Sequence, residues 1–274
     1  MWHIKHFLFF VALFVVVHTQ TNYCQPKLCT FGPGLPARPH IGCKNSGQFD
    51  RKTCPKDAQL MPITEDTKKL FLHIHNRLRD RFARGSMSPF QSAAKMPMLK
   101  WNDELAKLAE YNVRTCEFKH DQCRSTNICP YAGQNLGQMT SYPDYLDLNY
   151  VIKNITREWF LEYKLASQSH TDMFTTGSGK NGKAIGHFTA FIHEKSDKVG
   201  CAISKFVNKY KFKEYLVACN YCYTNMMKEK VYTKGQPCSQ CQSKKCDSVY
   251  KHLCDASEVI EPIPDILKNP RNGK

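Results

Sequence analysis

The cysteine content is the feature that most constrains what this chain can fold into. Fourteen cysteines occur among its 274 residues, and all of them follow Thr21. An even number of cysteines behind an apolar leader is typical of secreted domains, whose thiols are oxidised in pairs. The sequence therefore predicts a disulfide-bridged extracellular protein.

The N-terminal segment indicates the same compartment. Lys5 precedes an unbroken apolar run over residues 7–17, and polar residues follow at 18–21. Eleven apolar residues are too few to span a bilayer, and no later stretch is long and apolar enough to do so. We interpret residues 1–21 as a cleaved signal peptide and expect a secreted protein without a membrane span. The sequon Asn154-Ile155-Thr156 predicts N-glycosylation at Asn154.

The chain is strongly basic, with a formal net charge of +15 at pH 7. Its lysines and arginines are scattered along the sequence, which is typical of a solvated surface with a general affinity for acidic partners. No nucleic-acid-binding motif occurs, and a secreted protein rarely meets nucleic acid. We therefore expect no nucleic-acid partner.

Periodic apolar residues predict helices in the first half of the chain. Residues 22–62 form a cysteine-rich arm without periodicity. Thr64 and the acids after it predict a helix that ends at Gly85. A second helix opens at Asn102, and a third covers residues 148–163. Residues 133–137 are expected to form a glycine-bounded turn, and residues 167–183 a loop.

The second half predicts strands at residues 185–193, 199–207 and 212–221. In the first of these, alternation would place His187 and His193 on one face and Phe188 on the other. Helices followed by strands favour an α+β class in which helices are layered on an antiparallel sheet. Residues 227–274 form a tail with four more cysteines, and we expect disorder after Asp255.

Six short motifs occur in an order that resembles one family. They are His75-Asn76-x-Leu78-Arg79, Trp101-Asn102-Asp103-Glu104-Leu105, Cys116-x-Phe118-x-His120-Asp121-x-Cys123-Arg124, Gly133-Gln134-Asn135-Leu136, Gly186-His187-Phe188-Thr189 and Cys219-Asn220-Tyr221. Together they resemble the CAP superfamily (cysteine-rich secretory proteins, antigen 5, pathogenesis-related 1), and the arm from Asn22 onward resembles insect antigen 5 proteins. The resemblance implies a three-layer α-β-α sandwich, with the CAP domain over residues 63–226.

The resemblance also implies four disulfides. They are Cys24–Cys43, Cys29–Cys123, Cys54–Cys116 and Cys201–Cys219. The six remaining cysteines allow fifteen pairings, among which we favour Cys129–Cys222 and two bridges between Cys238, Cys241, Cys246 and Cys254. Cys219-x2-Cys222 and Cys238-x2-Cys241 also have zinc-ribbon spacing, but the secretory leader and the implied disulfide at Cys219 argue against that alternative.

By resemblance, the family's cleft gathers two histidines and two acids. His120 and His187 match the histidines and Glu162 matches one acid, whereas Gln134 stands at the position of the second. Two imidazoles could bind a divalent metal such as zinc weakly, although no cofactor is required. The alternative is a hydrogen-bonded network that only locks loop, helix and strand together.

The resemblance implies a non-enzymatic secreted protein that binds an extracellular protein or a small lipid, and we expect a monomer. Such a protein would be a salivary or venom allergen or a reproductive factor. The alternative is a metal-dependent hydrolase that uses His120, Glu162 and His187, but no His-Glu-x-x-His or Gly-x-Ser-x-Gly motif accompanies them. Tyr142, Tyr145 and Tyr150 could line an apolar channel for a lipid, with packing in the core or a turn as the alternative.

Overall fold

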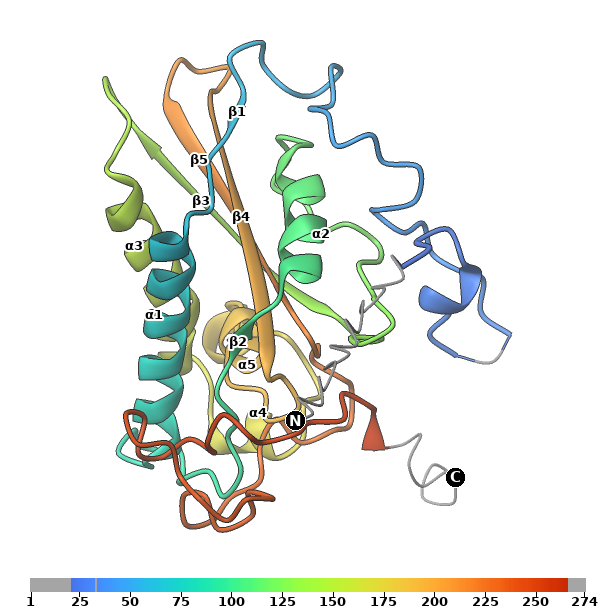
Figure 1. The fold of residues 1–274 in the computed structure, drawn as a ribbon. Helices are drawn as coiled ribbons and strands as arrows, with labels where there is room; N and C mark the ends of the chain where they lie inside the picture. Colours follow the sequence, from blue (N-terminus) through green and yellow to red (C-terminus); the bar gives the residue numbers. More distant parts are fainter. Residues whose placement is uncertain (1–20, 33, 266–274) are drawn as a thin grey trace, which may run out of the picture.

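The computed structural model describes residues 21–32 and 34–265, so the predicted signal peptide lies outside the described residues except for Thr21. The bounds of the helices and strands are η1 Pro26–Leu28, β1 Gln59–Leu60, α1 Glu65–Ala83, β2 Lys100–Trp101, α2 Asp103–Val113, β3 Gly133–Ser141, α3 Leu148–Leu161, η2 Glu162–Lys164, α4 Gln168–Asp172, η3 Lys180–Gly182, α5 Gly186–Phe191, β4 Lys198–Val207 and β5 Lys213–Tyr221. Helices and strands alternate as far as α3, after which further helical segments precede the two long strands β4 and β5 (Figure 1).

The sheet is built around the β4–β5 hairpin. The strand order is β1-β4-β5-β3 with antiparallel neighbours, and β2 adds a parallel pair to β4. The strands predicted at residues 199–207 and 212–221 are thereby confirmed. Cys201 lies opposite Cys219 in the hairpin register, and the two form a disulfide.

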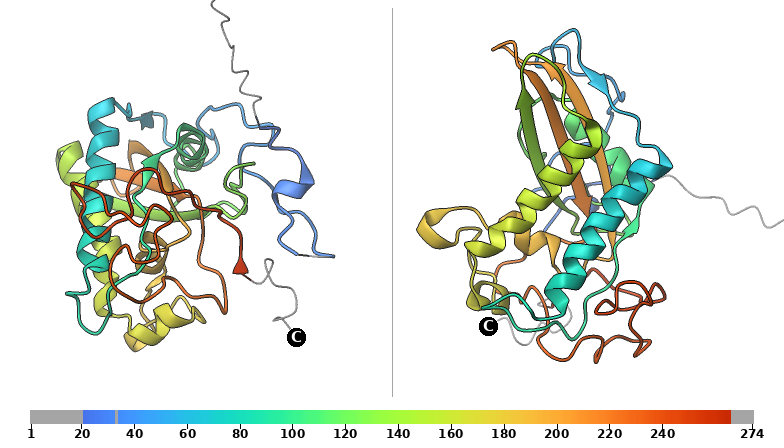
Figure 2. Two further views of the ribbon diagram at one scale, coloured as in Figure 1. Left: turned by 60° about the horizontal axis from the view of Figure 1, so that its bottom comes forward. Right: turned by 90° about the vertical axis from the view of Figure 1, so that its left-hand side faces the viewer.

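Helices cover both faces of the sheet, which confirms the α-β-α sandwich. Figure 2 (right) shows α1 and α3 side by side in front of the sheet, with α2 behind it. The larger core joins α1, α3 and α5 to one face of the sheet, through residues such as Phe71, Phe160, Phe188 and Tyr221. A smaller core joins α2 to the other face and includes Leu136.

Side-chain caps start the three long helices where the sequence predicts them. Thr64 Oγ1 accepts from the amide of Thr67 at 3.2 Å at the start of α1. Asn102 Oδ1 accepts from the amide of Leu105 at 2.8 Å at the start of α2. Asp147 caps α3 in the same way. Each cap satisfies a backbone donor that has no partner within its helix.

The turn predicted at residues 133–137 is wrong, because these residues begin strand β3. The glycines there permit close packing. A Cβ added to Gly137 would lie 2.3 Å from Ile155 Cγ2, and one added to Gly133 would lie 2.8 Å from the carbonyl oxygen of Tyr223. The loop predicted at residues 167–183 is wrong in part, since it contains α4, which a capping box between Ser167 and His170 starts.

All fourteen cysteines lie in the described residues and pair as seven disulfides. The four bridges implied by the resemblance are formed, and so is the favoured Cys129–Cys222 bridge. In the tail, Cys238 pairs with Cys246 and Cys241 with Cys254. The zinc-ribbon alternative is therefore wrong, because its four thiols are all oxidised.

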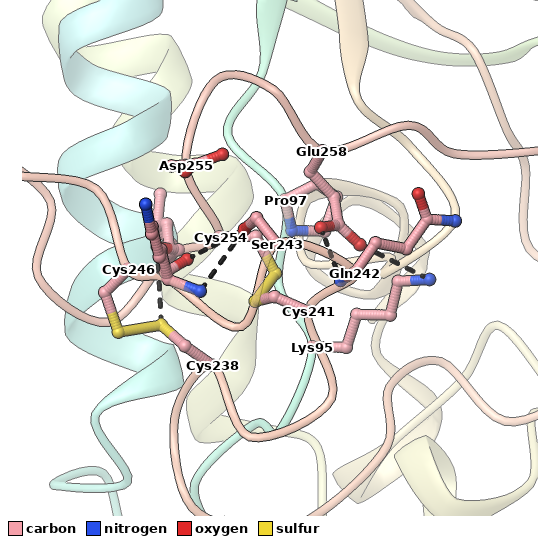
Figure 3. The surroundings of a disulfide bond; sticks show 12 residues. Lys95, Pro97, Cys238, Cys241, Gln242, Ser243, Cys246, Cys254, Asp255 and Glu258 are labelled. Carbon is pink, nitrogen blue, oxygen red and sulfur yellow. Dashed lines mark hydrogen bonds and ion pairs between the residues drawn. A yellow bond between two sulfur atoms is a disulfide. The ribbon is translucent and has the colours of Figure 1, made fainter.

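The disorder expected after Asp255 is wrong for residues 256–265, which pack on the sandwich. Glu258 is only 2% exposed. Figure 3 shows its carboxylate between Gln242, whose backbone amide donates at 2.8 Å, and Lys95, whose Nζ lies 3.5 Å away. Asp265 is 2.8 Å from the Nζ of Lys195. The last part of the expected disorder, residues 266–274, lies outside the described residues.

Candidate functional site

The strand predicted at residues 185–193 is wrong, because Gly186–Phe191 is the short helix α5. Phe188, Phe191 and Ile192 all enter the larger core, which the spacing i, i+3, i+4 of a helix permits and strand alternation does not. His193 is 1% exposed and packs against Tyr223, with ring centroids 4.6 Å apart. Burial in this core overrides the strand propensity of the aromatic and β-branched residues.

Glu162, at the C-terminal end of α3, holds the start of α5 and orients the ring of His187. Glu162 Oε2 accepts from the backbone amides of His187 and Phe188, at 2.9 and 3.1 Å. Its Oε1 accepts from His187 Nδ1 at 2.6 Å. Trp159 stacks on the His187 ring with centroids 6.2 Å apart. Because Nδ1 of His187 donates to a carboxylate, the lone pair of the neutral ring lies on Nε2.

The second histidine is held by the amide of Gln134. His120 Nδ1 lies 2.7 Å from Gln134 Oε1. The Gln134 amide nitrogen donates to Asp121 Oδ2 at 2.8 Å and to Asn220 Oδ1 at 3.0 Å. Asn220 in turn donates to the carbonyl oxygen of Leu105 at 3.0 Å. These partners fix the orientation of both amides, so His120 Nδ1 is the donor and Nε2 carries the lone pair.

Asp121 supplies the second carboxylate of the site, and it was not among the predicted site residues. Its Oδ2 also accepts from Asn112 at 3.1 Å, and its Oδ1 pairs with Arg124 Nε at 2.9 Å. The Asp121 side chain is 5% exposed, so the charge is buried but compensated. Asp121 and Asn220 both occur in the motifs of the resemblance, and the antiparallel pairing of β3 with β5 would have placed Asn220 opposite Gln134.

Asn135 joins the two histidine networks. It follows Gln134 on β3, and its Nδ2 donates to the carbonyl oxygen of His187 at 3.1 Å and to the Tyr221 hydroxyl at 3.3 Å. That hydroxyl lies 2.9 Å from His75 Nε2, and His75 Nδ1 lies 2.7 Å from the carbonyl oxygen of Phe71. Loop, strand, helix α5 and helix α1 are thereby connected by hydrogen bonds.

Burial lowers the pKa of two histidines in these networks, His75 and His120. Desolvation lowers the pKa of His75 to about 4, against a smaller upward effect of its hydrogen bond to Phe71. Desolvation also lowers the pKa of His120; the bond to Gln134 raises it, and the charges of Arg124 and His187 lower it further. Both rings therefore favour the neutral form, which is the form that binds metals.

Two pockets open beside His120. One has a volume of about 340 Å³ and is lined by Arg38, Gln122, Arg124, Gln134 and Thr224 together with His120 and Asp121. The other, of about 320 Å³, lies toward the arm and is lined by His40, Asn112, Thr115 and Lys119 among others. The first lining is mainly polar or charged, so it suits a polar ligand or a protein surface better than an acyl chain. The second exposes more apolar than polar surface, with Pro39 and Ile41 in its lining.

His120 and His187 could together hold a metal ion, but they offer only two ligand atoms. Both Nε2 atoms carry the free lone pair, as in metal sites whose second shell fixes the Nδ1 proton. Within residues 21–32 and 34–265, only Cys29–His40–Cys123 and Cys241–Cys254–Glu258 bring three ligand atoms within 4.8 Å of one another, and their cysteines are in disulfides. Two imidazoles without a third close ligand predict weak binding.

The tyrosines predicted to line a channel do not converge on one. Tyr142 and Tyr150 are 73% and 52% exposed. Tyr145 packs against Tyr215, with ring centroids 5.5 Å apart. Asn154 is partly exposed on α3 and donates to the carbonyl oxygen of Tyr150 at 2.8 Å, and its glycosylation stays a prediction.

Comparison with known proteins agrees with this geometry. The family model "CAP: Cysteine-rich secretory protein family" matches residues 72–221, which hold all four predicted cleft residues. The chain belongs to the CAP family. It is 35% identical over 254 residues to Venom allergen-1 of Aedes albopictus, covering 93% of this chain and 95% of that protein. It is 43% identical over 196 residues to Antigen 5 like allergen Cul n 1 of Culicoides nubeculosus, covering 70% and 87%.

A solved structure extends the CAP comparison to three dimensions. The crystal structure of NaASP2 with Zn²⁺ aligns with a TM-score of 0.58 at 27% identity, covering 74% of this chain and all of that one. In the described part of this CAP protein, no helix combines the length and the apolar content needed to cross a bilayer.

Proposed function

We propose that this CAP protein is a secreted, non-enzymatic binding protein of the antigen 5 type, which acts on an extracellular protein partner as a monomer. The named relatives support the type, since they are a venom allergen and an antigen 5 like allergen. A salivary or venom setting would make this protein allergen-like, and a reproductive setting would make it a secreted factor.

The observation that carries the non-enzymatic proposal is the pairing of the site's acids. Glu162 accepts three hydrogen bonds, two of them from the backbone. Asp121 is ion-paired with Arg124 and accepts from two amide side chains. Gln134, at the position of the family's second acid, cannot accept a proton at neutral pH. A general base needs a lone pair directed at its substrate. Here both carboxylates direct their lone pairs at donors within the protein.

Weak zinc binding by His120 and His187 is part of the proposal. The structurally similar NaASP2 was crystallised with Zn²⁺, and the free Nε2 positions of the two histidines here also support zinc binding. The bound ion would supply a positive charge and an anchoring point for a partner's carboxylate or imidazole. A small lipid is the less favoured ligand, because the pocket lined by Arg38, Arg124 and Gln134 is polar and the tyrosines expected to line an apolar channel do not converge.

The deciding experiment is an activity comparison on the purified, disulfide-bonded protein. Ester, peptide and phosphoester substrates would be offered with and without added zinc, to wild type and to Glu162→Gln and His187→Ala. We expect the three proteins to give the same background rate. Turnover that wild type shows and both variants lose would overturn the proposal and establish the hydrolase. A native mass spectrum of the secreted protein would reveal a retained acyl lipid, which would favour the small-lipid alternative.

A further inference from the structure

The β4–β5 hairpin ends in a patch of exposed aromatic rings and lysines, which we call the hairpin tip. Tyr142, Tyr210 and Phe212 are 73%, 70% and 44% exposed, and the rings of Tyr142 and Phe212 are in contact with centroids 6.1 Å apart. Large exposed rings that gather at one place indicate an interaction surface. The hairpin tip consists of Tyr142, Tyr145, Lys205, Lys209, Tyr210, Lys211, Phe212 and Lys213.

The turn that carries these rings is held by its own hydrogen bonds. Asn208 Oδ1 accepts from the amides of Tyr210 and Phe212, at 3.0 and 3.1 Å. Asn208 Nδ2 donates to Glu214 at 2.8 Å, and Lys211 takes a left-handed conformation with φ of 68°. A turn ordered in this way loses little conformational entropy when its rings are bound.

The lysines surround the rings. The Nζ of Lys209 lies 5.0 Å from the centre of the Tyr210 ring, while those of Lys205 and Lys213 lie 4.9 and 5.3 Å from the Tyr145 ring. Among the ion pairs of the described residues, none involves Lys205, Lys209, Lys211 or Lys213. Nearby acids serve other groups: Glu214 accepts from Asn208, and Asp57 accepts from the amide of Val207.

We propose that the hairpin tip docks on the surface of a membrane that contains anionic phospholipid. Tyrosine and phenylalanine rings partition into the interface between headgroups and acyl chains, and lysines beside them are attracted by the negative surface potential. The formal net charge of +15 adds long-range attraction to such a surface. A soluble polyanion would engage the lysines alone and would leave the exposed rings without a role.

Docking by the hairpin tip leaves the cleft accessible. Strand β3 runs from the Gln134 network to the tip, and nine strand residues span roughly 30 Å. The cysteine-bearing tail lies at the opposite end of the molecule from the β4–β5 hairpin (Figure 1). A docked molecule would therefore present the His120 pockets away from the lipid surface, where a partner could reach them.

Vesicle binding by the full mature protein tests the proposal. Vesicles of phosphatidylcholine alone would be compared with vesicles that also contain phosphatidylserine. We expect binding only to the mixed vesicles. Changing Lys209, Lys211 and Lys213 together to Gln should weaken it about 100-fold, since each lysine near an anionic surface contributes about fivefold in affinity. The matched control changes Lys244, Lys245 and Lys251, exposed in the tail, to Gln and should bind almost as wild type does.

Variants of the aromatic rings distinguish binding to a membrane from binding to a soluble polyanion. Tyr210→Ala with Phe212→Ala should weaken vesicle binding at least tenfold without weakening binding to heparin. Tyr210→Trp should show a blue shift of tryptophan emission with mixed vesicles. The proposal is overturned if wild type ignores the mixed vesicles, if the tail control loses as much binding as the tip variant, or if the ring variant binds as wild type does. Unchanged melting temperatures would show that each variant is folded.

Discussion

The two ends of strand β3 differ in what they leave to solvent. At its start, Gln134 and Asn135 are buried, and each makes several side-chain hydrogen bonds to neighbouring elements. Beyond its end, Tyr142 is exposed as part of the hairpin tip, whose four lysines form no ion pair among the described residues. One end is a rigid polar framework, and the other is an exposed surface of rings and lysines without ion pairs among the described residues.

This difference teaches where function can be sought in a protein that has Gln134 at the position where the resemblance implies an acid. Polar groups that are buried and paired rigidify a fold, and their removal costs stability. Charged and aromatic groups that are exposed contribute little to stability and remain available to partners. Substitutions at the cleft end should therefore change stability, and those at the hairpin tip should change binding.

The largest effect on stability is expected at Arg79, which binds backbone carbonyl groups at and after the end of α5. This fully buried side chain donates to the carbonyl oxygens of Pro97, Phe191, His193 and Ser196. Arg79→Met would leave these acceptors without partners and should lower the free energy of unfolding by about 4 kcal/mol or more. Chemical denaturation measures this, with Arg77→Met, exposed on the same helix, as the control. An equal loss of unfolding free energy in both variants would contradict the claim that the hydrogen bonds of Arg79 stabilise the cleft end.

Glu162→Gln should have the next largest effect. A glutamine can accept through one oxygen only, so its amide would face either the two backbone donors of α5 or the donor nitrogen of His187. Replacing charge-assisted hydrogen bonds in this way should cost about 2 kcal/mol of unfolding free energy. Glu158→Gln, exposed on α3, is the matched control. A Glu162 variant as stable as this control would show that the carboxylate does not hold α5.

The pH dependence of stability sharpens the account of the buried network. The folded pKa of His75, about 4, lies below its ordinary value of 6.5. The unfolded chain therefore binds protons first as the pH falls, and stability present above pH 6.5 is lost on the way to pH 4. This group alone should remove about 2 kcal/mol between about pH 7 and about pH 5.

His75→Gln isolates that contribution, because glutamine does not titrate in this range. We expect the variant to lose less stability than wild type on acidification, whereas His73→Gln, exposed on the same helix, should follow wild type. Parallel curves for wild type and His75→Gln would show that the ring takes up its proton without cost.

The sequence predicted the fold where local signals and tertiary packing agree. Capping residues and apolar stripes located α1, α2 and α3, and alternating segments located β4 and β5. The prediction failed at α5, whose helix depends on a carboxylate from α3 and on burial of Phe188 and Phe191, neither of which is a local signal. It failed at β3 because its glycines serve close packing, Gly137 against Ile155 and Gly133 against the backbone of Tyr223.

The candidate site was predicted in part. The resemblance supplied His120, Gln134, Glu162 and His187, which the structure places in two networks joined through Asn135. Asp121 was missed as the second carboxylate, because its role depends on the loop that brings it to Gln134. The motif of the resemblance contains Asp121 directly after His120, but it does not show that the loop brings this carboxylate to Gln134.

The smallest effect is expected at the hairpin tip. Tyr210→Ala removes a side chain that is 70% exposed and should change the free energy of unfolding by less than about 0.5 kcal/mol. Tyr221→Phe, at the cleft end, removes a hydroxyl that serves His75 and should cost at least about 1 kcal/mol. Denaturation curves that rank the two in the opposite order would remove the distinction between the ends of β3.

Nitrogen NMR of the histidine rings tests the central claim most directly, because the claim is that Gln134 and Glu162 fix both cleft imidazoles through Nδ1. Two-bond proton–nitrogen spectra at about pH 8, where imidazoles are mostly neutral, report which nitrogen carries the proton. The account predicts that His120 and His187 are both protonated at Nδ1, with both Nε2 signals shifting when zinc is added. A proton on Nε2 of either ring would contradict it.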